Sequence, residues 1–146
     1  EVKAAQMFSQ LDGAKRSEDL LAAYTTLKSR PDCTGKVGAI GFCFGGTTVG
    51  MFAVRLPDLA AAVPFYGGQP AAADVAKIKA PLMIHYAGLD DRINAGWPAF
   101  ETALKANGTR YEMFMYPNVN HGFHNDTTPR YDEAAAKVAF LDKNLR

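Results

Sequence analysis

A cysteine between closely spaced glycines is the strongest candidate for a nucleophile in this sequence. An apolar run leads into Gly41-Phe42-Cys43-Phe44-Gly45, and a helical pattern follows it. Glycines at these positions allow the backbones of a strand and a helix to approach closely around a sharp turn. The positive end of the helix dipole favours the thiolate form of a cysteine placed there. The pattern therefore predicts that Cys43 attacks a carbonyl carbon.

Two further residues with side chains of catalytic type lie after predicted strands. Asp90 follows an apolar strand, and His121 lies in a loop after the last predicted strand. An imidazole oriented by a carboxylate is the usual partner of a cysteine nucleophile.

The remaining histidines and the second cysteine are interpreted as structural. His85 lies inside an apolar strand, where a histidine is usually a satisfied core residue. His124 is expected to be structural or peripheral, and Cys33 is expected to stay reduced. The three histidines and two cysteines match no zinc motif. We therefore expect neither a metal nor an organic cofactor.

Helices and strands are expected to alternate along the chain. Helical patterns cover residues 8–27, 45–56, 97–106 and 129–145, with Ser17 and Thr128 as caps, and apolar strands cover 36–41, 59–66, 81–87 and 110–116. Parallel neighbours in a sheet require crossover connections, which these helices provide. The sequence thus predicts an α/β fold with a mostly parallel sheet and helices on both faces.

Three motifs together resemble those of the dienelactone hydrolase family: Gly41 to Gly46, Gly88-Leu89-Asp90 and His121-Gly122-Phe123. The similarity runs from about residue 36 to the last helix. Members of that family are α/β-hydrolases with a Cys-Asp-His triad that hydrolyse the ester of dienelactones. The resemblance implies that Cys43 is the nucleophile and His121 the base, in the chain order that α/β-hydrolase triads adopt. His121 would take the proton of the Cys43 thiol, while Asp90 accepts a hydrogen bond from the other ring N–H and fixes the tautomer. The resemblance favours Asp90 over the adjacent Asp91, because the family's acid directly follows Gly-x.

The resemblance also implies how the oxyanion is stabilised. One donor would be the backbone N–H of Phe44, and the second would come from a strand that precedes this segment in the family's fold. The family has a substrate-binding arginine a few residues beyond the catalytic histidine, where this sequence has His124 and Asn125. It usually has a proline where this sequence has Asn94.

Composition argues against several kinds of partner. Sixteen basic and fifteen acidic residues are scattered along 146 residues, which leaves no basic surface for nucleic acid or an anionic membrane. No apolar run approaches the roughly 20 residues that span a bilayer, and no signal peptide opens the chain. We therefore expect a small-molecule partner, which the resemblance implies to be an ester or lactone, and a cytoplasmic location.

Residues 1–146 are expected to form a single domain, equivalent to the C-terminal half of an α/β-hydrolase without its N-terminal strands. The strand at 36–41 lies in the middle of the sheet in that fold. Here it would form an apolar edge with unpaired N–H and C=O groups. We expect a second copy of the chain, or an N-terminal segment, to cover that edge.

Together these features predict a carboxylic ester hydrolase that cleaves an ester, lactone or thioester through an acyl-cysteine intermediate. Two alternatives stay open for the whole chain. It could be an inactive remnant or interaction module that has lost turnover with part of its oxyanion hole, or Cys43 could be a redox-sensing thiol, which would not require Asp90. For Cys43 alone, a small buried hydrophobic residue in a glycine-rich turn is a further interpretation.

Overall fold

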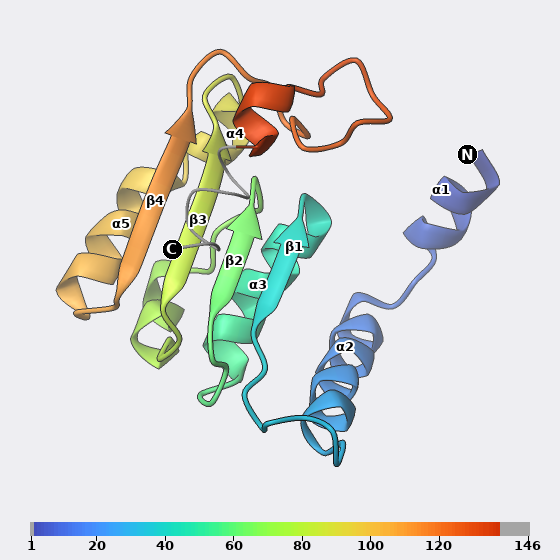
Figure 1. Cartoon of the computed structure of the whole chain (residues 1–146), viewed down its shortest axis with the longest axis vertical. Helices are drawn as coiled ribbons and strands as arrows, with labels where there is room; N and C mark the ends of the chain where they lie inside the picture. The colour runs from blue at the N-terminus through green and yellow to red at the C-terminus, as the bar shows by residue number, and fades with distance from the viewer. Residues whose placement is uncertain (1, 138–146) are drawn as a thin grey trace. The chain divides into compact units, whose positions relative to one another are not determined.

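The computed structural model describes residues 2–137 of the chain. The chain divides into two units between Val37 and Gly38. The first unit is helical, and the second contains the sheet (Figure 1). Among the described residues, no helix is long and apolar enough to cross a membrane.

In the first unit, the described residues form α1 (Val2–Ser9) and α2 (Gly13–Lys28). Asp12 is the N-cap of α2, because its side chain accepts two backbone N–H bonds of the first turn, at 2.8 and 3.2 Å. The expected cap at Ser17 is therefore wrong. Ser17 lies within α2, where its hydroxyl donates to a backbone carbonyl four residues earlier.

In the second unit, the described strands form a parallel sheet in the order β1-β2-β3-β4 (Figure 1). The strands are β1 (Ala39–Phe42), β2 (Ala62–Phe65), β3 (Leu82–Ala87) and β4 (Tyr111–Tyr116). This arrangement confirms the predicted α/β fold with a parallel sheet. β1 lies at one edge of the described sheet, with Ile40 54% and Phe42 40% exposed.

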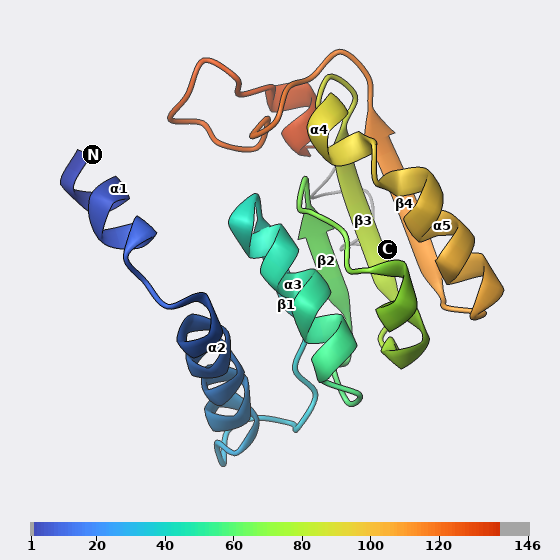
Figure 2. The same cartoon turned by 180° about the vertical axis from the view of Figure 1, so that it is seen from behind.

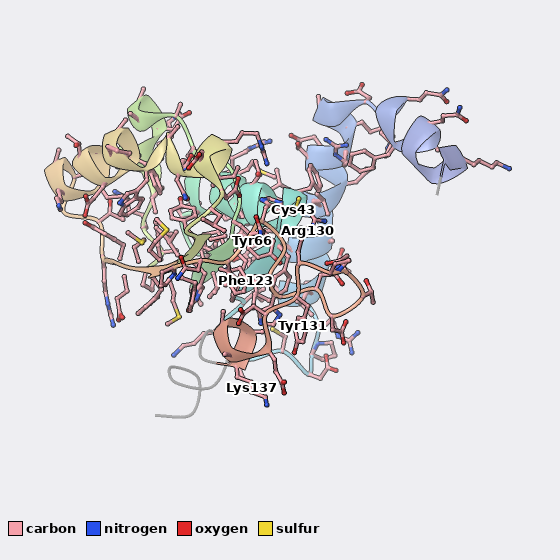
Figure 3. The ribbon with its side chains drawn as sticks, turned by 90° about the horizontal axis from the view of Figure 1, so that it is seen from above. Cys43, Tyr66, Phe123, Arg130, Tyr131 and Lys137 are labelled. Carbon is pink, nitrogen blue, oxygen red and sulfur yellow. The ribbon has the colours of Figure 1, made fainter. Side chains whose placement is uncertain are left out.

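Helices cover both faces of this sheet. One face carries α3 (Phe44–Arg55), the 3-10 helix η1 (Ala72–Lys77) and α5 (Trp97–Ala106) (Figure 2). The short α4 (Asp91–Asn94) lies between β3 and α5. Helical residues 133–137 lie on the opposite face (Figure 3).

The last helix begins later than its sequence pattern predicts. Residues 126–130 form turns, and helical structure starts at residue 133. Asp132 is the cap, because its Oδ1 accepts the backbone N–H of Ala135 at 2.8 Å. The expected start at Thr128 and Pro129 is therefore wrong. The predicted continuation to residue 145 lies outside the described residues.

A hydrophobic cluster supports the carboxyl ends of the strands. It contains Phe65, Tyr66, Ala87, Tyr116, Val119 and Phe123. His85 is 1% exposed, stacks on Phe65 with ring centroids 4.2 Å apart, and has Nδ1 2.9 Å from the Tyr116 hydroxyl. This confirms that His85 is a core residue.

Candidate active site

Cys43 lies on the turn that joins β1 to α3. Its backbone has φ 55° and ψ −115°, in a region that non-glycine residues rarely adopt. Hydrogen bonds hold this conformation on both sides: the Cys43 N–H donates to the Phe65 carbonyl, and the Cys43 carbonyl accepts from the Thr47 N–H, both at 3.1 Å. The structure therefore maintains local backbone strain at the residue whose chemistry the motif predicts.

The glycines around Cys43 differ in how much they are needed. A Cβ on Gly41 would lie 2.2 Å from the Gly45 carbonyl oxygen, and a Cβ on Gly46 would lie 2.5 Å from the Phe65 carbonyl oxygen. A Cβ on Gly45 would meet no atom within 4 Å. Close backbone approach therefore explains why glycine stands at positions 41 and 46. The expectation that Gly45 also leaves no room for a Cβ was wrong.

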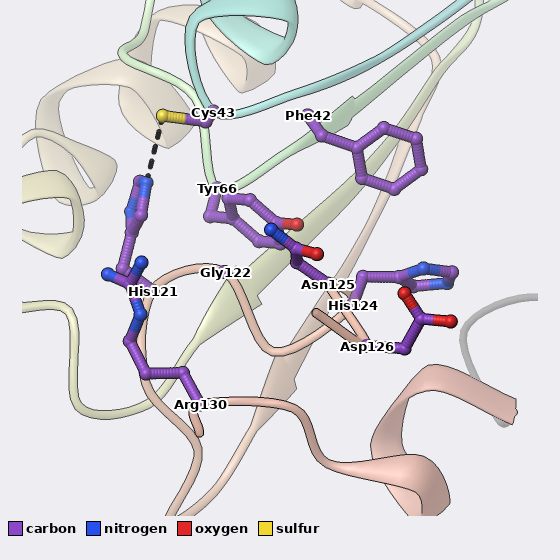
Figure 4. A pocket seen from close by; sticks show the side chains of 9 residues that line it. All are labelled: Phe42, Cys43, Tyr66, His121, Gly122, His124, Asn125, Asp126 and Arg130. Carbon is purple, nitrogen blue, oxygen red and sulfur yellow. Dashed lines mark hydrogen bonds between the residues drawn. The ribbon is translucent and has the colours of Figure 1, made fainter. Parts of the chain in front are cut away.

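A continuous chain of hydrogen bonds joins the three predicted site residues. His121 Nε2 lies 3.1 Å from Cys43 Sγ, as Figure 4 shows. On the other side of the ring, His121 Nδ1 lies 2.5 Å from Asp90 Oδ2. Asp90 is 7% exposed, whereas the adjacent Asp91 is exposed and begins α4. The structure thus brings Asp90, and not Asp91, to His121.

The exposure of Cys43 tests whether this residue is a small buried hydrophobic side chain. Its side chain is exposed and faces His121 rather than the core. The interpretation of Cys43 as a small buried hydrophobic residue is therefore wrong. An exposed sulfur beside an imidazole is in the position that a nucleophile requires.

A pocket of about 420 Å³ opens beside the sulfur. It is lined by Phe42, Cys43, Tyr66, His121, Gly122, His124, Asn125, Asp126 and Arg130 (Figure 4). Aromatic rings from the strand ends form one part of the lining, and polar side chains of the loop after β4 form another. His124 thus lies at the pocket wall, with its ring centroid 5.1 Å from that of Phe42.

A second hollow of about 210 Å³ shares three of these residues. Cys43, Tyr66 and His121 line both spaces, and the second also contacts Phe44 and Arg92. Cys43 and His121 therefore border two hollows, which lie beside the sulfur and the imidazole.

Tyr66 supports the imidazole of His121. It follows β2 with a positive φ of 36°, and its ring meets that of His121 edge to face with centroids 4.9 Å apart. Burial, and secondarily the nearby Cys43, raises the pKa of Tyr66 to about 12. Its phenol therefore stays protonated at neutral pH and can donate a hydrogen bond. Sequence reasoning missed Tyr66, because it counted this residue as the end of the predicted strand at 59–66.

Arg130 is a second residue that sequence reasoning missed. The pattern of the loop gave no signal, because Arg130 follows His121 by nine positions with turns between them. Its guanidinium carbon lies 3.7 Å from the point where a Cβ on Gly122 would stand, next to His121. Among residues 2–137, no carboxylate forms an ion pair with Arg130. The pocket therefore contains a guanidinium that forms no ion pair with the described carboxylates, although Asp126 also lines the pocket.

The described residues offer no metal centre. No group of three His, Cys, Asp or Glu side chains within residues 2–137 could hold a metal ion.

Comparison with known proteins agrees with the motifs. The model of the dienelactone hydrolase family matches residues 2–143. The chain belongs to this family. It is 33% identical over 124 residues to a Saccharolobus solfataricus protein named "Putative carboxymethylenebutenolidase", covering 84% of this chain and 47% of that protein.

Two further similar proteins show the same partial coverage. The "Probable 2-oxo-3-(5-oxofuran-2-ylidene)propanoate lactonase" of Bradyrhizobium sp. is 29% identical, covering 89% of this chain and 57% of that protein. The crystal structure of the dienelactone hydrolase-like promiscuous phosphotriesterase P91, from metagenomic libraries, superposes with a TM-score of 0.77 at 26% identity, covering 94% of this chain and 62% of that one. The chain thus spans about half the length of the curated relatives it matches.

Proposed function

We propose that this chain carries the triad of a hydrolase that cleaves an ester, lactone or thioester through an acyl-cysteine intermediate. The observation that carries the proposal is the unbroken sequence of contacts from buried Asp90 through His121 to the exposed sulfur of Cys43. This order of contacts supports roles for Asp90 as orienting acid, His121 as base and Cys43 as nucleophile in covalent hydrolysis. Membership of a family of hydrolases supports the same reaction class.

In the first half of the reaction, His121 Nε2 takes the thiol proton and the Cys43 thiolate attacks the carbonyl carbon. The carbon becomes tetrahedral and its oxygen becomes an oxyanion. When the oxyanion collapses, the bond to the leaving group breaks, and the imidazolium gives its proton to the leaving oxygen or sulfur. Throughout, Asp90 accepts the Nδ1–H bond and stabilises the positive charge on the ring.

In the second half, water releases the acyl group from Cys43. His121 Nε2 removes a proton from the water while the oxygen attacks the thioester carbon. The carbon–sulfur bond breaks and the thiolate recovers the proton from the imidazolium. The products are a carboxylic acid and the starting thiol, so the cycle consumes one water and requires no other reactant.

Stabilisation of the oxyanion is proposed to use the backbone N–H of Phe44. Phe44 is the first residue of α3 and directly follows Cys43, so its backbone N–H lies at the N-terminal end of the helix beside the sulfur-bearing residue. The positive end of the helix dipole adds to the attraction for a developing negative charge. The second donor is proposed to come from outside this segment, since the chain spans only about half the length of its relatives.

The substrate is proposed to be a small ester or lactone that carries a carboxylate. The pocket of about 420 Å³ is of the size that small molecules occupy. Phe42 and Tyr66 supply apolar contact, and Arg130 supplies a cation suited to a carboxylate. The name of the Bradyrhizobium relative describes a lactone with a propanoate group, which combines both features.

The exposed edge of the sheet supports a proposed partner. Ile40 and Phe42 present half-exposed apolar side chains on β1, an edge strand of the described sheet. We propose that an N-terminal segment or a second copy of the chain pairs with this strand. Light scattering after size exclusion tests the proposal. A soluble, monodisperse monomer consisting of these 146 residues alone would contradict it.

A burst experiment tests the reaction. Each protein is mixed with p-nitrophenyl acetate, and the first turnover is followed by release of p-nitrophenol. The wild type should give a burst equal to its active-site concentration, and Cys43→Ala should give none. Cys33→Ala is the matched control, because it removes the other free cysteine and should keep the burst. A burst that survives Cys43→Ala, or a wild type that gives none, would contradict the proposal.

A further inference from the structure

The acidic member of the triad stands in a short loop that closes on itself. Asp90 lies between the end of β3 at Ala87 and the start of α4. The Asp90 N–H donates to the Ala87 carbonyl at 3.1 Å, and the Asp90 carbonyl accepts the backbone N–H groups of Ile93 and Asn94 at 3.1 and 2.9 Å. The backbone on both sides of the carboxylate is therefore held within this loop.

One side chain links the two ends of the loop. Asn94, the last residue of α4, donates its Nδ2–H to the Ala87 carbonyl at 2.8 Å. The same carbonyl accepts the Asp90 N–H. The Asn94 amide thus completes a ring of hydrogen bonds that runs from β3 through Asp90 to α4 and back to β3.

The rest of the loop is fixed by neighbouring elements. Gln69 Nε2 donates to the Ile93 carbonyl and to the Tyr86 hydroxyl, each at 2.9 Å. The Gly88 and Leu89 N–H groups donate to carbonyls at the end of β4 and in the loop that follows it, at 2.8 and 3.0 Å. These contacts anchor the outer parts of the loop. The Asn94 amide acts at the centre, where the Asp90 backbone turns.

The side-chain oxygen of Asn94, unlike its nitrogen, lies in an unfavourable environment. Its Oδ1 is buried and has no hydrogen-bond partner among residues 2–137. An unpaired buried oxygen costs free energy that an apolar side chain of similar size would avoid. The amide therefore contributes to this loop through its donated bond to the Ala87 carbonyl.

We propose that Asn94 is a positioning residue that aims the Asp90 carboxylate at His121 Nδ1. This inference rests on the proposed triad and adds to it a residue that touches neither sulfur nor imidazole. Without the Nδ2–H bond, the Asp90 backbone gains freedom and its carboxylate leaves the 2.5 Å contact with His121 for part of the time. The ring then samples orientations in which Nε2 does not face the sulfur, so the chemical step slows while the substrate pocket is unchanged.

The test compares Asn94→Leu with a matched variant elsewhere. Asn107→Leu removes the same kind of bond, because Asn107 Nδ2 also donates to a backbone carbonyl at 2.8 Å, at the end of α5. With p-nitrophenyl acetate, Asn94→Leu should lower kcat about 10- to 100-fold with KM little changed. Asn107→Leu should leave both constants near wild type. Equal kcat values for the two variants would overturn the proposal.

A double-mutant cycle separates positioning from a general structural effect. Asp90→Asn removes the charge that Asn94 is proposed to aim, so Asn94→Leu should cause little further loss of kcat in that background. A full additional loss there would mean that Asn94 acts by another route and would overturn the proposal. Asn94→Ser, a smaller polar change, serves if Asn94→Leu fails to fold by circular dichroism.

A readout without turnover keeps this inference distinct from the proposed reaction. The proton shared between His121 Nδ1 and Asp90 should give a far-downfield proton NMR signal in the wild type and in Asn107→Leu. The signal should weaken or move upfield in Asn94→Leu. If the wild type shows no Cys43-dependent burst but the signal changes as expected, the hydrolase proposal fails and the positioning role stands. An unchanged signal in a folded Asn94→Leu protein would overturn the inference.

Discussion

Substitution of Gly41 by alanine should damage the protein far more than the same substitution at Gly45. A Cβ on Gly41 would lie 2.2 Å from the Gly45 carbonyl oxygen and 2.4 Å from its carbon, where real contacts stay above 3.0 Å. Both of these atoms are backbone, so the start of α3 must move by most of an ångström. Such overpacking costs about 1–3 kcal/mol of unfolding free energy. Because Cys43 stands between the two glycines, the shift should also lower kcat/KM by about 100-fold.

Gly45→Ala is the matched control for this prediction. It adds the same methyl group to the same turn, but a Cβ there meets no atom within 4 Å. Because Gly45 lies in the first turn of α3, alanine should leave stability unchanged or raise it by up to about 1 kcal/mol. Urea denaturation and p-nitrophenyl acetate hydrolysis measure the two effects. If Gly41→Ala matched Gly45→Ala in both assays, the reasoning from backbone approach would be refuted.

Three further predictions follow from individual side chains. Arg130→Gln should lower kcat/KM by about 10- to 100-fold for a p-nitrophenyl ester that carries a terminal carboxylate. It should leave kcat/KM unchanged for the neutral ester of equal length. Equal effects on both esters would contradict the proposed substrate class. Burial raises the pKa of Tyr86 from 10.0 to about 12. Because Tyr86 ionises in the unfolded chain at a lower pH than in the folded one, the free energy of unfolding measured in urea should fall as pH rises from about 10. Tyr86→Phe should reduce that fall, and an unchanged pH dependence in this variant would contradict the prediction. Asp132→Ala should lower the unfolding free energy by about 1 kcal/mol through loss of the helix cap, with kcat unchanged. A loss of kcat equal to that of a triad variant would count against a purely capping role for Asp132.

The site was predictable where its residues stand on regular elements. Cys43, Asp90 and His121 each follow a strand, and parallel strands bring their carboxyl ends to one edge of a sheet. A short motif with glycines at fixed spacing was therefore enough to indicate that these side chains meet. The burial of His85 was also predictable, because a residue inside an apolar strand is expected to lie in the core.

The residues that were missed depend on contacts distant in sequence or on elements too short to show a pattern. Arg130 reaches the pocket through a series of turns, which have no periodicity. Asn94 ends a helix of four residues, so only the fold shows that its amide meets Ala87. The cap of α2 was misplaced because Ser17 and Asp12 are both good capping residues, and which one begins the helix depends on where the preceding turn ends.

The most direct test of the proposed hydrolase is to locate the acyl group. Wild-type protein is quenched with acid soon after mixing with p-nitrophenyl acetate, and the acetylated position is mapped by peptide mass spectrometry. The proposed mechanism predicts one acetyl group on the peptide that contains Cys43, its absence in Cys43→Ala, and much slower labelling in His121→Ala. Labelling of Cys33 at the same rate as Cys43, or no loss of labelling in His121→Ala, would contradict a nucleophile activated by His121.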